Sequence, residues 1–187
     1  MSNPHRADCG RCAALCCVLT GFAASEAFAF NKADGEPCPH LSVHRCTVHA
    51  DLDARGLRGC RAFTCFGAGQ RATEAFGLAT HTWGQAPLPQ GLDAAFGALC
   101  AIQYCRWLVE EALEASPDSA PLHAESHALT SLAEAPPAAL EGLDLGALSV
   151  RVADLLGDPA GPDHRFDDLQ GADLRGADLR DANLAFA

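Results

Sequence analysis

The sequence predicts a mainly α-helical protein with an irregular cysteine-rich N-terminal region and a short coil of repeats at its C-terminus. Eight of the ten cysteines lie between Cys9 and Cys65. The middle of the chain is rich in Ala, Leu and Glu, with apolar residues near helical spacing. The last part repeats with a period of five. We therefore expect a cysteine-rich metal- or cluster-binding region (residues 1–86), a helical region (87–162) and a repeat tail (163–187).

Composition and charge exclude several classes of function. The chain has 187 residues, of which 49% are hydrophobic and 6% aromatic, so we expect a thin, helix-rich core. A formal charge of −11 disfavours nucleic acids and anionic membrane surfaces as partners. The polar N-terminus is unlike a signal peptide, and no apolar run approaches the ~20 residues of a membrane span. We therefore expect a cytoplasmic protein.

The helical region divides into three predicted helices. The first covers Gly91 to Ala115, where large apolar residues recur near helical spacing. The second covers Pro121 to Glu134, and the third covers residues 137–156, with a break near residues 142–146 where two glycines occur. Cys100 and Cys105 lie on the first helix and are expected to be core residues.

Two apolar positions recur every five residues in the tail. The large ones are Leu169, Leu174, Leu179 and Leu184, and the small ones are Ala172, Ala177 and Ala182. This pattern resembles the pentapeptide-repeat family, which implies a right-handed quadrilateral β-helix with Leu and Ala pointing inward. Four repeats make about one coil, and stacked repeats need neighbours for stability. The coil must therefore pack on the helical region, on a partner protein or on further repeats.

The N-terminal cysteines follow a spacing typical of metal ligands. The candidate ligands are Cys9, Cys12, Cys16, Cys17, Cys38, Cys46, Cys60 and Cys65. Cys12 and Cys16 would lie about 6 Å apart along one helical face, whereas Cys9 would begin in a loop. The adjacent Cys16 and Cys17 cannot point the same way on a helix. In a reducing cytoplasm such cysteines favour thiolate ligands, whereas disulfides would be expected in a secreted protein.

The identity of the metal stays open between zinc and an iron–sulfur cluster. Eight thiolates suit two tetrahedral zinc sites, or one four-thiolate cluster with spare thiols. Zinc is slightly favoured because it tolerates diverse cysteine spacings. His40, His44 and His49 are alternative zinc ligands, because imidazole often joins thiolate at zinc.

The cysteine blocks also resemble a known family. Cys9-Gly-Arg-Cys12-Ala-Ala-Leu-Cys16-Cys17, Pro37-Cys38-Pro-His, Arg45-Cys46-Thr-Val-His and Gly59-Cys60-Arg-Ala-Phe-Thr-Cys65 are similar to the cysteine-rich zinc- or iron-chelating family related to YkgJ. The usual family opening has one residue fewer between the second and third cysteines. The whole chain resembles actinobacterial-type proteins that join such a domain to a pentapeptide-repeat tail, in which the block 66–70 and Trp83 recur. The resemblance implies metal binding but no reaction.

These observations leave three functions open. The first is metal binding through the eight cysteines, with a structural or redox role. The second is an interaction adaptor, in which the tail binds a partner protein and metal is only scaffold. The third is an iron–sulfur oxidoreductase. The residues show no catalytic triad or nucleotide fingerprint, so enzyme activity is left open. Arg55, Arg58 and Arg61 form a small basic patch that could steady a thiolate cluster or lie at the surface.

Overall fold

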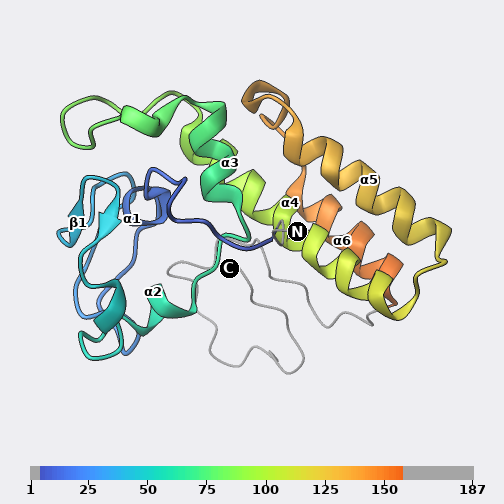
Figure 1. The fold of residues 1–187 in the computed structure, drawn as a ribbon, viewed down its shortest axis with the longest axis horizontal. Helices are drawn as coiled ribbons and strands as arrows, with labels where there is room; N and C mark the ends of the chain where they lie inside the picture. The colour runs from blue at the N-terminus through green and yellow to red at the C-terminus, as the bar shows by residue number, and fades with distance from the viewer. Residues whose placement is uncertain (1–4, 158–187) are drawn as a thin grey trace.

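The computed structural model describes residues 5–157. Within that range, six α-helices and one two-stranded sheet make up the main regular structure (Figure 1). The helices are α1 (Leu15–Leu19), α2 (Arg58–Ala62), α3 (Ala68–Ala75), α4 (Leu92–Ala115), α5 (Ala120–Glu134) and α6 (Leu145–Leu156). The mainly α-helical fold class is therefore confirmed for these residues. The predicted β-helix coil of residues 163–187 lies outside them.

The three helices predicted for the middle of the chain are present. Helix α4 begins directly after Gly91, whose φ of 74° places it in the left-handed region that glycine adopts without strain. Helix α5 has Pro121 in its first turn, where a missing N–H costs little. Helix α6 begins only at Leu145, because the side chain of Asp144 caps it by accepting from the Ala147 N–H at 2.8 Å. The third helix is thus shorter than predicted, because residues 137–139 form the 3-10 helix η3 (Pro137–Ala139) and turns occupy residues 140–142.

The predicted helical relation between Cys12 and Cys16 is wrong. Helix α1 begins at Leu15, and its N-cap residue Ala14 has a φ of 61°. A left-handed residue interrupts a right-handed helix, so Cys12 lies in the preceding loop and shares no helical face with Cys16. Cys9 lies in the same loop, as expected.

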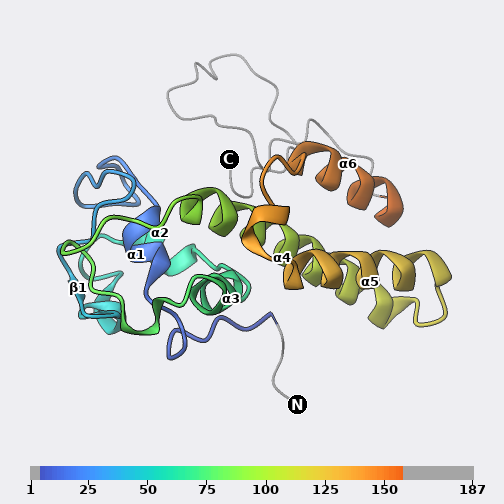
Figure 2. The same ribbon diagram turned by 90° about the horizontal axis from the view of Figure 1, so that it is seen from above.

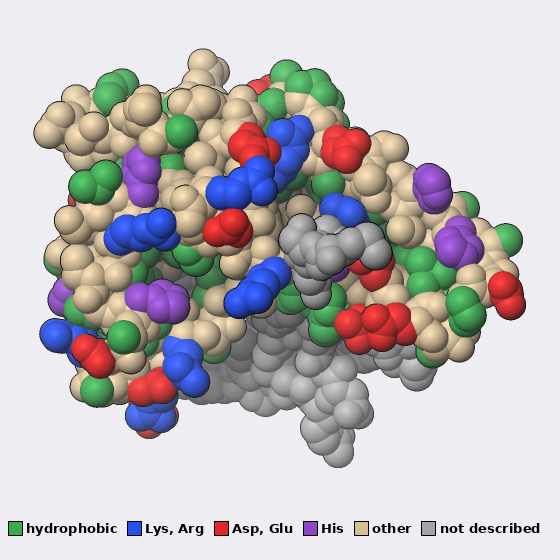
Figure 3. Space-filling view, viewed as in Figure 1, with side chains coloured by type: hydrophobic (Ala, Val, Ile, Leu, Met, Phe, Trp, Pro, Cys, Tyr) green, Lys and Arg blue, Asp and Glu red, His purple; other side chains and the backbone are tan. Residues whose placement is uncertain are grey.

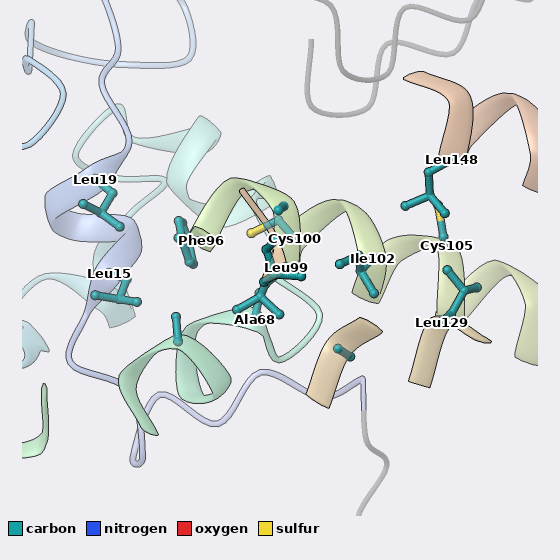
Figure 4. Packing of buried hydrophobic residues seen from close by; sticks show 14 of the residues in the cluster. Leu15, Leu19, Ala68, Phe96, Leu99, Cys100, Ile102, Cys105, Leu129 and Leu148 are labelled. Carbon is teal, nitrogen blue, oxygen red and sulfur yellow. The ribbon is translucent and has the colours of Figure 1, made fainter. Parts of the chain in front are cut away.

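One hydrophobic core joins the N-terminal part of the chain to the helical region. Leu15 and Leu19 of α1 and Ala68 of α3 belong to the same buried cluster as residues of α4, α5 and α6 (Figure 4). Cys100 and Cys105 are 6% and 1% exposed and lie in this core, as expected. Packing is therefore continuous across residue 86, and the predicted domain boundary there stays a prediction.

A second, smaller hydrophobic cluster lies within the cysteine-rich lobe, by which we mean residues 5–66. It consists of Val48, Leu52 and Leu57, with Phe28, Phe30 and Cys46 packed against them. Strands β1 (Leu41–Ser42) and β2 (Arg45–Cys46) form an antiparallel hairpin beside it, at the left of Figure 1. Figure 2 shows this lobe at one end of α4 and the helices α5 and α6 along the rest of it.

Arg71 connects α3, the helix that follows the N-terminal cysteines, to the C-terminal end of α5. Its Nε donates to the carbonyl of Ala133 at 2.8 Å, and its Nη2 donates to the carbonyl of Glu134 at 2.7 Å. These carbonyls lie in the last turn of α5, where helical partners are missing. A single guanidinium therefore caps α5 and fixes α3 against it.

None of the helices found between residues 5 and 157 combines the length and the apolar character that crossing a membrane requires.

Candidate metal centre

All eight cysteines predicted as ligands line one cavity of about 570 Å³. They come from segments up to 56 positions apart in the sequence, between Cys9 and Cys65. All eight are free thiols. The structure therefore brings together a set of residues that the sequence could only list.

Local structure places the thiols around this cavity in three ways. Helix α1 carries Cys16 and Cys17, and α2 carries Cys60. Strand β2 carries Cys46. The other four, Cys9, Cys12, Cys38 and Cys65, lie on loops.

Two of the loop cysteines are held by backbone hydrogen bonds. The N–H of Cys38 donates to the carbonyl of Cys17 at 2.8 Å. The carbonyl of Cys9 accepts from Nη1 of Arg45 at 2.7 Å. These contacts connect the first cysteine block to the two blocks around the hairpin.

The loop that carries Cys12 is fixed through its neighbour Ala13. The Ala13 N–H donates to Oγ1 of Thr73 at 2.9 Å, and Nε1 of Trp83 donates to the Ala13 carbonyl at 2.7 Å. Thr73 is buried, and its hydroxyl donates in turn to the carbonyl of Gly69 at 2.8 Å. Thr73 and Trp83 therefore hold the loop that positions Cys12, although both lie far from Cys12 in the sequence.

Gly69 allows two of the sulfur atoms to approach the backbone of α3. A Cβ atom at this position would lie 2.7 Å from Sγ of Cys12 and 3.6 Å from Sγ of Cys65. The first distance is shorter than any real Cβ contact, so only glycine fits without a shift. Gly69 belongs to the block 66–70 that follows Cys65, and the structure places it against these sulfur atoms.

Aromatic rings form much of the remaining wall. Phe22 and Phe28 stack with their centroids 4.2 Å apart, and Phe30 meets Phe22 edge-on at 5.4 Å. Phe63 and Phe96 also line the cavity. Such a wall lowers the local dielectric constant, which strengthens the attraction between thiolates and a metal cation.

Lys32 is a buried cation beside the thiols. It is 7% exposed, and its Nζ donates to the carbonyls of Val18, Thr20 and Ala33 at 2.9, 2.8 and 3.1 Å. Burial lowers its pKa, and the nearby thiol of Cys38 acts in the opposite direction. Its position suits a cavity that contains negative charge. Sequence reasoning missed Lys32 because it stands apart from every cysteine block.

The basic patch near Cys60 lies at the surface, which was the second of its two predicted roles. Arg55, Arg58 and Arg61 are not among the residues that line the cavity. Arg61 instead lies at the surface, where its Nε is 3.2 Å from a carboxylate oxygen of Asp53. Figure 3 shows arginine and histidine side chains on the surface of the cysteine-rich lobe.

Four thiols of the cavity resist ionisation in the metal-free chain. Burial raises the pKa of Cys9, Cys12 and Cys60. The pKa of Cys16 is raised far above its usual range, first by its hydrogen bond with Cys17 and then by burial. At neutral pH these groups are therefore protonated, and a metal must displace the protons as it binds.

The three histidines considered as alternative ligands also line this cavity. Nε2 of His44 contacts the carbonyl of His81 at 2.7 Å, so only its other ring nitrogen remains for a ligand. The ring of His40 packs edge-on against Phe30, with centroids 5.7 Å apart. His49 begins the 3-10 helix η1 (His49–Asp51).

The donor chemistry fits a thiophilic metal, although no coordination shell is preformed. Between residues 5 and 157, no three Cys, His, Asp or Glu side chains are grouped closely enough to hold an ion. The thiols surround the cavity and would have to move inward on binding. Thiolate donors are nevertheless the ligands that Zn²⁺ and iron–sulfur clusters prefer.

Comparison with known proteins gives two matches. The family model described as "Pentapeptide repeats (8 copies)" matches residues 168–187. The chain is also 49% identical over 69 residues to the "Uncharacterized protein YybG" of Bacillus subtilis (strain 168), which covers 36% of this chain and 25% of that protein. This similarity is longer than the repeat match, so it includes residues outside the repeats.

The chain spans about a quarter of the length of this relative. No solved structure matches the chain. Neither match tests the resemblance of the cysteine-rich region to the YkgJ-related family, which stays a prediction. The predicted repeat segment is confirmed: this chain carries pentapeptide repeats in residues 168–187, a type of segment with a structural or protein-interaction role.

Proposed function

We propose that the chain binds a thiophilic metal through the cysteines of the cavity, with zinc as the leading candidate. The observation that carries the proposal is the gathering of all eight N-terminal cysteines, as free thiols, around one cavity. Core packing alone does not need this arrangement, because the main core is built mostly from Leu, Ala and other apolar residues. Cys100 and Cys105 show how the same chain uses cysteine for packing: both are buried in that core.

The surroundings of the thiols support the same proposal. The cavity combines an aromatic wall with two cations, Lys32 and Arg45, and its lining includes no carboxylate side chain. The carboxylates of Asp34 and Glu36, which also act on Lys32, lie outside this lining. Cations near a thiolate site offset the negative charge that four thiolates leave around one Zn²⁺. Metal binding would also hold together a lobe that has little regular structure, so binding would contribute directly to folding.

Metal analysis of the intact chain tests this proposal. The protein is purified without oxygen, and its zinc, iron and acid-labile sulfide are measured per chain together with a visible spectrum. Zinc at about two ions per chain with no visible absorption is expected. Iron with equimolar sulfide and a brown colour would favour the iron–sulfur alternative, including a redox role. A chain that binds neither metal, with its ten thiols free, would overturn the proposal.

A second function is supported by the repeats of residues 168–187. We propose that this tail provides a contact for a partner protein, with the metal-bound lobe as scaffold. Isolated repeats cannot bury a core by themselves, which favours a neighbour that stacks on them. Crosslinking in cells that express the full chain or a chain lacking residues 164–187, followed by mass spectrometry, tests this role. A specific partner should be lost with the tail, and a partner retained after deletion would contradict the adaptor function.

A further inference from the structure

Residues 5–12 form a strap along one wall of the cysteine cavity. Figure 2 shows this dark blue segment passing α3 on its way to the N-terminus. Ala7, Cys9 and Cys12 of the strap line the cavity. His5 is 8% exposed at one end, and the fully buried Ala13 follows the other end. Residues 8–11 between them are exposed, so the strap is an arch with buried ends and a middle at the surface.

Side chains alone connect the strap to the rest of the described chain. Among residues 5–157, the one backbone–backbone hydrogen bond of the strap is internal, from the Arg11 N–H to the Asp8 carbonyl at 3.0 Å. Segments without a backbone ladder to their neighbours open locally at a lower free energy than helices and strands do. The strap is therefore the part of the cavity wall that opens most easily.

Helix α3 holds the middle of the strap through Gln70 and Glu74, which lie one helical turn apart on the same face. Oε1 of Gln70 accepts from the Asp8 N–H at 3.0 Å, and its Nε2 donates to the Arg6 carbonyl at 3.2 Å. The carboxylate of Glu74 pairs with the guanidinium of Arg11. The Gln70 amide thus clamps the strap backbone with both of its ends.

Helix α4 holds the N-terminal end of the strap. Nε2 of His5 contacts Oε2 of Glu110 at 2.6 Å. The other carboxylate oxygen of Glu110 lies 3.6 Å from Nη2 of Arg106. Nη1 of Arg106 donates in turn to Oε1 of the buried Gln103 at 2.8 Å. A row of polar side chains on α4 therefore keeps Glu110 in place as the partner of His5.

The opposite end of the strap is fixed at Ala13. Its N–H donates to Oγ1 of Thr73 at 2.9 Å, and its carbonyl accepts from Nε1 of Trp83 at 2.7 Å. Both backbone groups of Ala13 are thus used, and the side chain of Thr73 is buried. Any swing of the strap must therefore pivot on the N-terminal side of Ala13.

Metal binding requires the thiols of the cavity to approach one another. Between residues 5 and 157, no three candidate donors are grouped closely enough to hold an ion. The cysteines outside the strap are held by backbone structure. Cys16, Cys17 and Cys60 lie in helices, Cys46 lies in β2, and the backbones of Cys38 and Cys65 make hydrogen bonds to Cys17 and Ala68. Cys9 and Cys12, on the strap, have the least backbone restraint.

We propose that the strap opens and closes the cysteine cavity: it swings away from α3 to admit a metal ion and returns with Cys9 and Cys12 as ligands. This inference rests on the proposed metal binding and adds the path of entry. When the strap opens, Sγ of Cys12 leaves its place beside Gly69, where Sγ of Cys65 also lies. Opening therefore exposes both of these thiols, whereas Cys38 and Cys46 keep their surroundings.

Site-resolved thiol alkylation of the metal-free, reduced full chain tests the opening. Gln70→Met removes both hydrogen bonds of the clamp with little change of side-chain length. Each lost hydrogen bond shifts an equilibrium by a factor of about two to ten. Cys12 and Cys65 should therefore react with iodoacetamide at least about fivefold faster, and Cys38 and Cys46 at an unchanged rate. Unchanged rates at Cys12 and Cys65, or equal acceleration at all four cysteines, would overturn the proposal.

Gln85→Met is the matched control, because Gln85 is exposed and does not line the cavity. It should leave all alkylation rates unchanged, and acceleration equal to that of Gln70→Met would overturn the role of the clamp. His5→Ala releases the other end of the strap and should accelerate the same two thiols. This second variant decides the question if circular dichroism shows that Gln70→Met has lost its helices.

The rate of zinc uptake connects the strap to metal binding. The metal-free chain is mixed with Zn²⁺ bound to a weak chelating dye, and the dye spectrum follows the transfer. Gln70→Met should take up and release zinc about fivefold faster, because entry and exit both require an open strap. A variant with a merely damaged site would bind zinc less tightly without faster uptake.

The two readouts separate failure of the strap from failure of the metal site. Faster alkylation of Cys12 with unchanged or slower zinc uptake would overturn the proposal that the strap controls entry. An original chain that binds no zinc would overturn the proposed function itself, and the alkylation rates would still decide whether the strap opens.

Discussion

The close approach of two sulfur atoms to Gly69 gives a prediction with a matched control in the same chain. Gly69 lies in α3, where a Cβ would meet Sγ of Cys12 at 2.7 Å. Gly97 lies in α4, where a Cβ would meet nothing within 4 Å. Substitution by alanine adds the same methyl group to a helix at both positions. The two variants therefore differ in the space available and not in chemistry.

The expected magnitudes follow from two opposing effects. Replacing a helical glycine by alanine stabilises a helix by roughly 0.5–1 kcal/mol, because alanine loses less backbone entropy on folding. Gly97→Ala should show this gain. Gly69→Ala should add an overpacking cost of about 1–3 kcal/mol, because the sulfur of Cys12 must shift by several tenths of an ångström. The unfolding free energies of the two variants should thus differ by about 1–3 kcal/mol.

Urea unfolding of the zinc-loaded, reduced chain measures this difference. In that state Cys12 is expected to be held by the metal and cannot turn away from the new methyl group. Circular dichroism follows the helices, and the midpoint and slope of each transition give the unfolding free energy. If Gly69→Ala stabilises the chain as much as Gly97→Ala does, the close approach of Cys12 to α3 is refuted.

Three further predictions follow from named contacts. Lys32→Met leaves three buried or part-buried carbonyls without their donor and should cost about 1–3 kcal/mol in urea unfolding. Arg61→Met, at an exposed ion pair, should cost at most about 1 kcal/mol. Equal costs would contradict the buried role of Lys32. Arg71→Lys removes the fork that caps α5 and should cost about 1–2 kcal/mol, and an unchanged thermal midpoint would refute this cap. Buried thiols such as Cys12 have a pKa raised in the folded state, so their contribution to stability is complete below their ordinary value of 9.0 and is lost as pH rises beyond it. Unfolding free energies of the metal-free chain between pH 7.5 and 10.5 should therefore fall above about pH 9, and a flat profile would contradict the burial of these thiols.

The helical region was predictable because its signals are local. Apolar spacing marks α4, and prolines and glycines mark the ends of α5 and the late start of α6. Each signal acts within a few residues of the element that it defines. For that reason the sequence alone was enough to place these three helices within a residue or two, except at the start of the third.

The cysteine-rich lobe was less predictable because its geometry depends on long-range contacts. The spacing indicated eight ligands, and the structure places them around one cavity. The same spacing suggested a helical face shared by Cys12 and Cys16, which the left-handed backbone of Ala14 prevents. Local propensity does not favour the left-handed conformation for alanine, so no sequence signal predicted it.

The groups that position the thiols were the hardest to predict. Lys32 reaches its carbonyl partners only because the chain folds back from residue 32 onto the end of α1. Thr73 lies 60 positions from Ala13, whose N–H it accepts. Such contacts have no spacing rule, so a single sequence carries no signal for them.

X-ray absorption at the zinc edge of the anaerobically purified chain tests the central claim most directly. It reports the atoms bound to the metal without requiring a crystal or any activity. We predict a single shell of about four sulfur atoms at about 2.3 Å, with no nitrogen or oxygen neighbours. A shell dominated by nitrogen or oxygen, or a chain without bound metal, would contradict the claim that the cysteines around the cavity are metal ligands.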